Sequence, residues 1–196
     1  MNVLFLDTAS LENSLAFCNE KKVLTHRSIE KLKSDSELIP MIEDCMKEIG
    51  ITYKDLTHLA CTIGPGGFTS LRIGIATINT LSYALGIPSV GIHLSDLLEV
   101  RVLDRVRAFW LHSTRRTQLF AKNPDSDEIK LLSIDDAKNL KCSYIGELIE
   151  DHKQALPNCT PLPGDQFMTL EEVLPSFLSG LSYSNDQLMP WYGRDS

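Results

Sequence analysis

The chain has 196 residues, of which 43% are hydrophobic, and its formal charge is −7. This length suits one large domain or two smaller lobes around a sizeable core. The net negative charge argues against a protein that binds nucleic acid by itself, because binding to the phosphate backbone needs a basic surface. A role inside a nucleic-acid-modifying complex stays open.

The cysteines are odd in number and show no C-x-x-C spacing: Cys18, Cys45, Cys61, Cys142 and Cys159. Neither a disulfide framework nor a zinc ribbon is expected, and we expect reduced, mostly buried thiols. The N-terminal apolar run is short, lacks a basic region and is interrupted by Asp7, which predicts a strand instead of a signal peptide. No run approaches about 18 apolar residues, so no membrane contact and a cytoplasmic location are expected.

The first half alternates between strand and helix patterns. Short apolar runs with polar links predict an antiparallel meander, and 3.6-residue periods predict two helices ending at glycines. In chain order we expect strands over 2–8, 14–19 and 21–29, a helix over 34–50, a strand over 56–64, a helix over 69–86 and a strand over 87–94. Ser34, Asp35 or Ser36 is the expected cap of the first helix, and Thr69 or Ser70 of the second. This β-β-β-α-β-α-β order defines a first lobe over residues 1–98.

The second half is less regular and predicts a smaller lobe over residues 99–196. A hairpin is expected around Thr114–Arg116, followed by a short helix over 133–140, a strand over 142–148 and a Pro-rich loop. A capping-box pattern at Thr169 and Glu172 predicts a last helix over 169–180.

The stretch "CTIGPGGFTSLRIG" (61–74) lies between a predicted strand and a predicted helix. Backbone N–H groups at such a place can hold an anion, but the spacing fits neither a Walker A loop nor G-x-G-x-x-G. A tight turn built on glycine is favoured. A vestigial phosphate site is the weaker alternative, with the loop residues Gly64, Gly66 and Gly67 and the strand-end residues Asp7, Thr8 and Ser10, which could face Mg²⁺-bound phosphates or simply cap a hairpin.

The second predicted helix is apolar nearly all round, and the first predicted helix also has an apolar face. Such helices are either buried deeply or shared with a partner. The candidate partner or dimer interface comprises Leu38, Met41, Ile42, Cys45, Leu71, Arg72, Ile75, Ala76 and Asn79. No catalytic or metal-binding residues are predicted, because the histidines lack ligand spacing and no nucleophile elbow occurs; a dispersed Ser-His-Asp or Cys-His triad stays open.

The segment "IGPGGFTSLRIGIAT" closely resembles the signature of the bacterial TsaB (YeaZ) family. "LFLDTAS…SLAF", "SELIPMIEDCMKEIGI…DLTHLACTIGPG", "ALGIPSVGIHLSDLL" and "PWYGR" are similar to other segments of that family in the same order, and "STRRTQLFAK" is a weaker match. The chain departs from the family at Ser34–Ser36, where a His is common, and at Gly67, Ser70 and Ser113. The stretch between Leu98 and Arg107 looks shortened.

The resemblance implies an actin/Hsp70-like (ASKHA, ribonuclease H-like) duplicated α/β fold with a reduced second lobe. It implies a non-catalytic subunit of the machinery that installs threonylcarbamoyl on adenosine 37 of ANN-decoding tRNAs. The implied partners are a TsaD-type catalytic subunit docked through the first two helices, a TsaE-type ATPase, a second copy of the chain, and tRNA only through the complex. No cofactor is implied for this chain itself; ATP or ADP with Mg²⁺ would belong to the partner complex.

Two enzymatic alternatives make different predictions. An ASKHA-type ATPase would use Asp7, Thr8 and the loop Gly64–Gly67, but no second phosphate loop or adenosine-binding Gly-Gly motif is found in the latter half. A glycoprotease-like peptidase has no metal-ligand or nucleophile motif in its support.

Overall fold

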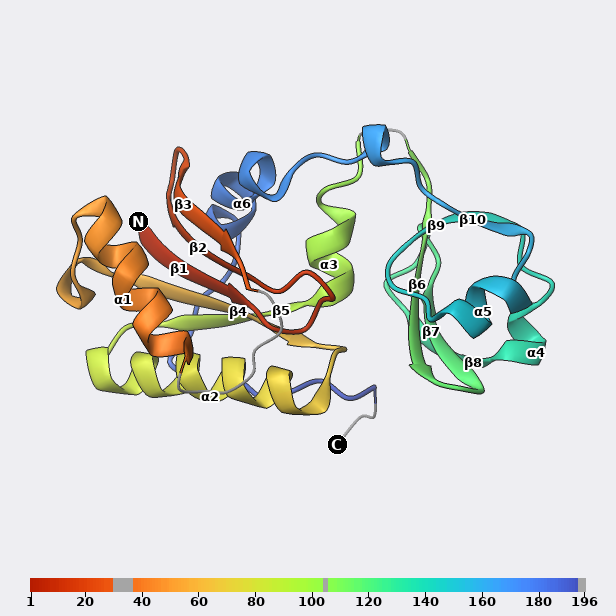
Figure 1. Cartoon of the computed structure of the whole chain (residues 1–196), viewed down its shortest axis with the longest axis horizontal. Helices are drawn as coiled ribbons and strands as arrows, with labels where there is room; N and C mark the ends of the chain where they lie inside the picture. The colour runs from red at the N-terminus through yellow and green to blue at the C-terminus, as the bar shows by residue number, and fades with distance from the viewer. Residues whose placement is uncertain (30–36, 104–105, 194–196) are drawn as a thin grey trace. The chain divides into compact units, whose positions relative to one another are not determined.

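The computed structural model describes residues 1–29, 37–103 and 106–193. They form two compact units (Figure 1): residues 1–94 with 169–192, and residues 95–168 with Gly193. The first unit contains β1 (Asn2–Asp7), β2 (Ser14–Asn19), β3 (Val23–Ser28), α1 (Leu38–Ile49), β4 (His58–Gly64), α2 (Phe68–Leu85), β5 (Ser89–His93) and α6 (Leu170–Ser179).

The second unit has shorter elements. It contains α3 (Leu94–Glu99, whose first residue belongs to the first unit), β6 (Phe109–Arg115), β7 (Gln118–Lys122), β8 (Ile129–Ser133), α4 (Ile134–Ala137), β9 (Cys142–Ile145), α5 (Glu150–Ala155) and β10 (Cys159–Pro161).

The two sheets repeat one topology. The first has the order β3-β2-β1-β4-β5, and the second has β8-β7-β6-β9-β10, which is the same order shifted by five strands. In each sheet the first three strands pair antiparallel, and the first, fourth and fifth pair parallel. The predicted duplicated α/β fold of the actin/Hsp70 type is therefore confirmed. The second copy is reduced: its helices α4 and α5 have 4 and 6 residues, where α1 and α2 have 12 and 18.

The core of the first unit follows from strand alternation. Side chains of one strand point to opposite faces of a sheet, so Leu4 and Leu6 of β1 share one face, where they join buried residues of α1 and α2. Helix α6 packs against β2 and β3, and Figure 1 shows it on the other side of the sheet from α2.

The return of α6 corrects the predicted lobes. A single division after residue 98 assigned residues 169–192 to the second lobe, whereas they fold with the first unit. The apolar side of α6 is buried there through Val173, Leu174 and Leu178. The predicted division after residue 98 lies close to the first boundary between the units, after Leu94. The second boundary, after Met168, was not predicted.

The helix ends confirm some of the predicted caps and correct one. Both long helices end at a left-handed glycine, Gly50 and Gly86, as glycine allows at little steric cost. The capping box of Thr169 and Glu172 is present. The expected cap of α2 was wrong, because its N-cap is Gly67. The expected cap of the first helix, at Ser34, Asp35 or Ser36, lies outside the described residues.

Candidate interaction surface and strand-edge loop

The glycine-rich loop joins β4 to α2 and lies on the β1–β2 turn. Gly64 has a φ of 125°, in the region that glycine favours. A Cβ on Gly66 would stand 2.5 Å from the carbonyl oxygen of Ala9, and one on Gly74 would stand 2.2 Å from Thr8 Oγ1. The glycines of this stretch therefore serve close packing of the loop and of α2 on the strand edge.

Asp7 is buried at this edge, and both of its carboxylate oxygens accept hydrogen bonds. Its Oδ1 accepts hydrogen bonds from the backbone N–H groups of Ala9 (2.9 Å) and Ser10 (3.2 Å) and from Thr62 Oγ1 (2.6 Å). Its Oδ2 accepts one from Ser10 Oγ at 2.5 Å. The structure thus brings the predicted strand-edge residues together, and Asp7 and Ser10 share an internal hydrogen-bond network. The buried Thr8 Oγ1 makes no hydrogen bond in the described part of the chain and lies instead against Gly74 of α2.

These residues do not fit a Mg²⁺-bound phosphate. A carboxylate offers about four lone-pair sites; Asp7 accepts three hydrogen bonds at Oδ1 and one at Oδ2, all from its own turn and from Thr62, which leaves little capacity for a metal ion. Gly66 is in contact with Ala9, where a phosphate between loop and turn would need room. Among the residues in the described ranges, no group of three or more His, Cys, Asp or Glu side chains could hold a metal ion.

The predicted interface residues separate into two groups. Buried in the core of the first unit are Leu38, Ile42, Cys45, Leu71 and Ile75. The interface assignment is wrong for this group, because side chains enclosed by the chain's own sheet cannot reach a partner. Met41 and Asn79 are half-buried, and Arg72 and Ala76 are exposed.

A row along the exposed side of α2 is open to solvent. Residues four apart lie on one side of a helix, and Phe68, Arg72, Ala76 and Thr80 follow that spacing and are all exposed. Tyr83 continues the row with 92% of its surface exposed. We call these five residues the α2 row.

Phe68 and Arg72 also belong to a cluster with the C-terminal segment. The Arg72 guanidinium lies 3.8 Å from the centre of the Phe68 ring, and Arg72 Nε donates to Tyr192 Oη at 2.9 Å. The rings of Phe68 and Tyr192 stack with their centres 5.8 Å apart. Phe68 is 59% and Tyr192 41% exposed. Two aromatic rings and an arginine held in place are typical of binding hot spots.

The segment 184–192 is bound along the first unit. Ser184 and Ser89 exchange backbone hydrogen bonds, N to O, of 3.0 and 2.8 Å, which pairs the segment with the free edge of β5. The Asn79 side chain donates to Leu188 O and accepts from Leu188 N, and Trp191 N donates to Ile63 O at 2.7 Å. The Asn79 side chain therefore fastens this segment to α2.

Sequence reasoning missed Phe68, Tyr83 and Tyr192 as surface residues. The signal available was their type: large aromatic side chains in a signature helix and in the "PWYGR" segment. Periodicity identified an apolar helix but could not tell which side the sheet would cover.

A serine and a histidine do meet in the second unit. Ser113 Oγ lies 2.8 Å from His152 Nδ1, and His152 Nε2 lies 3.0 Å from the carbonyl oxygen of Arg116. That contact places the ring hydrogen on Nε2, so Nδ1 accepts from Ser113. Ser113 Oγ also accepts from Ile149 N at 2.9 Å. The pair ties the β6–β7 turn to the start of α5.

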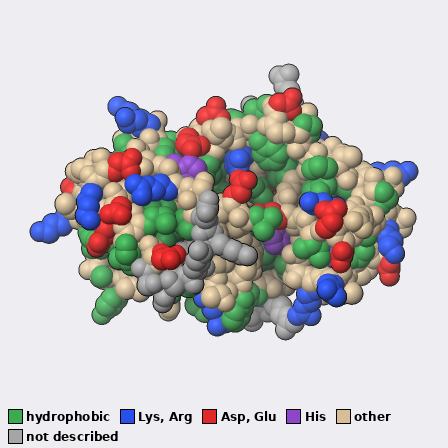
Figure 2. All heavy atoms as spheres, viewed as in Figure 1, with side chains coloured by type: hydrophobic (Ala, Val, Ile, Leu, Met, Phe, Trp, Pro, Cys, Tyr) green, Lys and Arg blue, Asp and Glu red, His purple; other side chains and the backbone are tan. Residues whose placement is uncertain are grey.

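On the face shown in Figure 2, basic and acidic side chains are intermixed over each unit. Among the described residues, that face presents no broad basic area of the kind that a polyanion needs. In the described part of the chain, no helix is both long and apolar enough to cross a membrane.

A family model described as TsaD, tRNA N6-adenosine threonylcarbamoyltransferase, matches residues 30–176. The chain belongs to this family. The proteins named tRNA threonylcarbamoyladenosine biosynthesis protein TsaB from Escherichia coli K12 and from Buchnera aphidicola (Schizaphis graminum) are 32% and 33% identical to it. These alignments cover 47% and 49% of the chain and 40% and 46% of the relatives, so the chain matches less than half the length of either.

Two solved structures share the fold over nearly the whole chain. One is described as an uncharacterized protein with similarity to peptidase YEAZ from Pseudomonas aeruginosa, with a TM-score of 0.71, 21% identity and coverage of 98% of this chain and 99% of that one. The other, YeaZ from Pseudomonas aeruginosa, has a TM-score of 0.69, 19% identity and coverage of 97% and 99%. The chain thus shares its fold with these two YeaZ-type structures, and part of it is similar in sequence to the TsaB proteins that its signature segment resembles.

Proposed function

We propose that the chain is a non-catalytic subunit of the cytoplasmic machinery that installs threonylcarbamoyl on adenosine 37 of ANN-decoding tRNAs. It docks a TsaD-type catalytic subunit, a TsaE-type ATPase joins the complex, and tRNA is reached only through the complex. The observation that carries the proposal is the internal use of Asp7: the strand-edge carboxylate has four hydrogen bonds to its own chain. In this chain the Asp7 carboxylate therefore serves folding, although the family model is described as a transferase.

The docking surface in this proposal is the α2 row together with Tyr192. It replaces the broader predicted set, because it contains the two members of that set that are fully exposed, Arg72 and Ala76. The same surface would serve a second copy of the chain, so homodimer and heterodimer compete for it.

The decisive experiment is reconstitution. The cognate TsaD-type protein is purified with and without this chain, and threonylcarbamoyladenosine on a substrate tRNA is measured by nucleoside mass spectrometry. We expect co-purification and a product yield that depends on the chain. Full product yield without the chain, or no association, contradicts the proposal.

Calorimetry on the chain alone distinguishes the ATPase alternative from the proposed function. We expect no heat of ATP binding with Mg²⁺ at millimolar nucleotide, since Asp7 is engaged and Gly66 is packed on Ala9. Saturable Mg²⁺-dependent binding would favour the ATPase. Peptide hydrolysis by the chain with added metal ions would favour the peptidase.

A further inference from the structure

Two cysteines of the second unit face each other across neighbouring strands. Cys142 of β9 and Cys159 of β10 are direct partners in the parallel register. Adjacent strands lie about 4.8 Å apart, inside the Cα separation of roughly 4.4–6.8 Å that a disulfide spans. The Sγ atoms of the two free thiols are 3.4 Å apart.

The strand that Cys159 belongs to is weakly held. β10 has 3 residues and lies at the edge of its sheet. Its last residue, Pro161, has no N–H to donate to the ladder. Two backbone hydrogen bonds flank the pairing of β9 with β10. Cys142 N donates to Asn158 O at 3.3 Å, and Leu162 N donates to Tyr144 O at 2.8 Å. A covalent link at this place would therefore change how firmly the edge is held.

We propose that Cys142 and Cys159 form a reversible disulfide that fastens β10 to β9. The oxidant is a low-molecular-weight disulfide such as oxidised glutathione. The Cys142 thiolate, on the half-buried and more accessible residue, attacks one glutathione sulfur and releases one glutathione thiolate. The Cys159 thiolate then attacks Cys142 Sγ in the mixed disulfide and releases the second. Two protein thiols are oxidised and one glutathione disulfide is reduced; the two protons lost by the protein thiols are taken up, through solvent, by the two released glutathione thiolates, which become thiols.

The rate of this exchange follows thiolate content. Burial, and then the neighbouring Cys159 thiol, raise the pKa of Cys142 to about 12. The thiol is therefore almost wholly protonated at neutral pH, so the exchange is slow there and accelerates about tenfold per pH unit as the thiolate fraction rises.

The test uses the full chain equilibrated in glutathione buffers of stepped redox ratio, quenched with an alkylating agent and mapped by non-reducing peptide mass spectrometry. We expect one linked peptide pair, Cys142 with Cys159, that dithiothreitol reverses. Cys18, Cys45 and Cys61 are buried in the first unit and serve as internal controls that alkylate fully after denaturation. The matched variants Cys142→Ser and Cys159→Ser should each abolish the link.

Three outcomes overturn the inference: full alkylation of both cysteines at every ratio, a different pairing, or glutathione retained on Cys142 as a stable mixed disulfide. Because a serine at buried Cys159 could impair folding, hydrogen exchange of the wild type gives a second measurement. The amides of Cys159, Thr160 and Leu162 should exchange several-fold more slowly in the oxidised form than in the reduced form. Unchanged exchange would show that the bond does not fasten the strand.

Discussion

The side chain of Asn79 holds the backbone of Leu188 by two hydrogen bonds at once. Its Nδ2 donates to Leu188 O at 3.0 Å and its Oδ1 accepts from Leu188 N at 2.9 Å. These residues are 109 positions apart. The position of the segment 184–192 therefore depends on α2, the helix of the signature segment.

Asn79→Ala should release the segment 184–192. Each lost hydrogen bond contributes about 1 kcal/mol, so we expect a loss of about 2 kcal/mol in the free energy of unfolding, measured by urea titration. Limited proteolysis should cut the segment faster. Thr80→Ala, at the exposed neighbour, is the matched control and should leave the cleavage rate unchanged. Equal cleavage of both variants would contradict the fastening role of Asn79.

Gly66→Ala should strain the strand-edge loop. The new methyl group would meet backbone atoms of Ala9 at 2.5–2.9 Å, and overpacking of this kind costs about 1–3 kcal/mol. The control is Gly164→Ala, because nothing lies within 4 Å of a Cβ there. Thermal unfolding of both variants measures the difference, and a Gly66→Ala protein as stable as the control would disprove the close packing.

Asp7→Asn distinguishes a structural carboxylate from a metal ligand. The amide nitrogen cannot accept hydrogen bonds, so donors of Ala9, Ser10 or Thr62 lose a charged acceptor. We expect a loss of at least about 2 kcal/mol of stability, measured by denaturant unfolding without added metal. A carboxylate kept for Mg²⁺ would instead give unchanged or higher stability on neutralisation.

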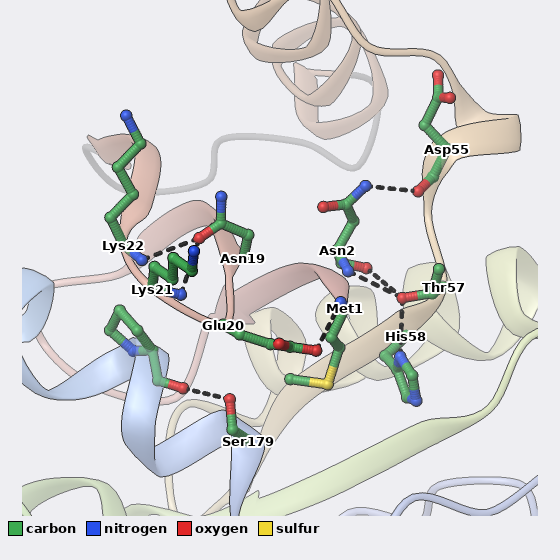
Figure 3. A network of polar contacts seen from close by, with 11 residues as sticks. Met1, Asn2, Asn19, Glu20, Lys21, Lys22, Asp55, Thr57, His58 and Ser179 are labelled. Carbon is green, nitrogen blue, oxygen red and sulfur yellow. Dashed lines mark hydrogen bonds and ion pairs between the residues drawn. The ribbon is translucent and has the colours of Figure 1, made fainter.

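His58 should make stability fall in mild acid. Burial, and then the charge of the N-terminal ammonium, lower its pKa below the ordinary value; Figure 3 shows Met1 and His58 in one polar network with Thr57. Below about pH 6.5 the unfolded chain takes up the proton first, which favours unfolding. The stability contributed at neutral pH is thus lost as the pH falls from about 6.5 through the folded-state pKa.

The measurement is the free energy of unfolding of wild type minus that of His58→Asn between pH 7.5 and 5, where the difference should shrink with falling pH. Acetylation of the N-terminus should weaken this pH dependence by removing one cause. A pH-independent difference would show that the His58 pKa is unshifted.

Ala76→Glu tests the α2 row. A charge that must be desolvated in the interface should weaken association with the TsaD-type protein at least about tenfold, or ~1.4 kcal/mol. Ser176→Glu adds the same charge on α6, at an exposed position, and should associate as the wild type does. Ile75→Glu would not serve, because Ile75 is buried and the change would test folding. Wild-type affinity of the Ala76 variant would exclude the row from the interface.

Strand and helix patterns predicted the first unit well because each signal was local. The apolar runs at 2–8 and 56–64 contain β1 and β4, and Gly50 and Gly86 ended the helices as expected. The second unit was harder. β10 and α5 have 3 and 6 residues, too few for a period to emerge, and neither was predicted.

Side-chain direction in the candidate site could not be predicted for a different reason. Ile75 and Ala76 are adjacent in one apolar helix, and only the position of the sheet decides that the first is buried and the second exposed. The contact of Arg72 with Tyr192 joins residues 120 positions apart, and no local pattern encodes it.

The discontinuous make-up of the first unit has a consequence during translation. A ribosome delivers about 5–20 residues per second from the N-terminus, and the first unit is complete only when residues 169–192 have emerged. The second unit, inserted between these pieces, has all but its last residues outside the exit tunnel earlier. Nascent chains stalled before residue 169 should therefore expose the β5 edge and the sheet face that α6 covers, and chaperones can bind both. The order of emergence makes the inserted unit the earlier of the two to fold.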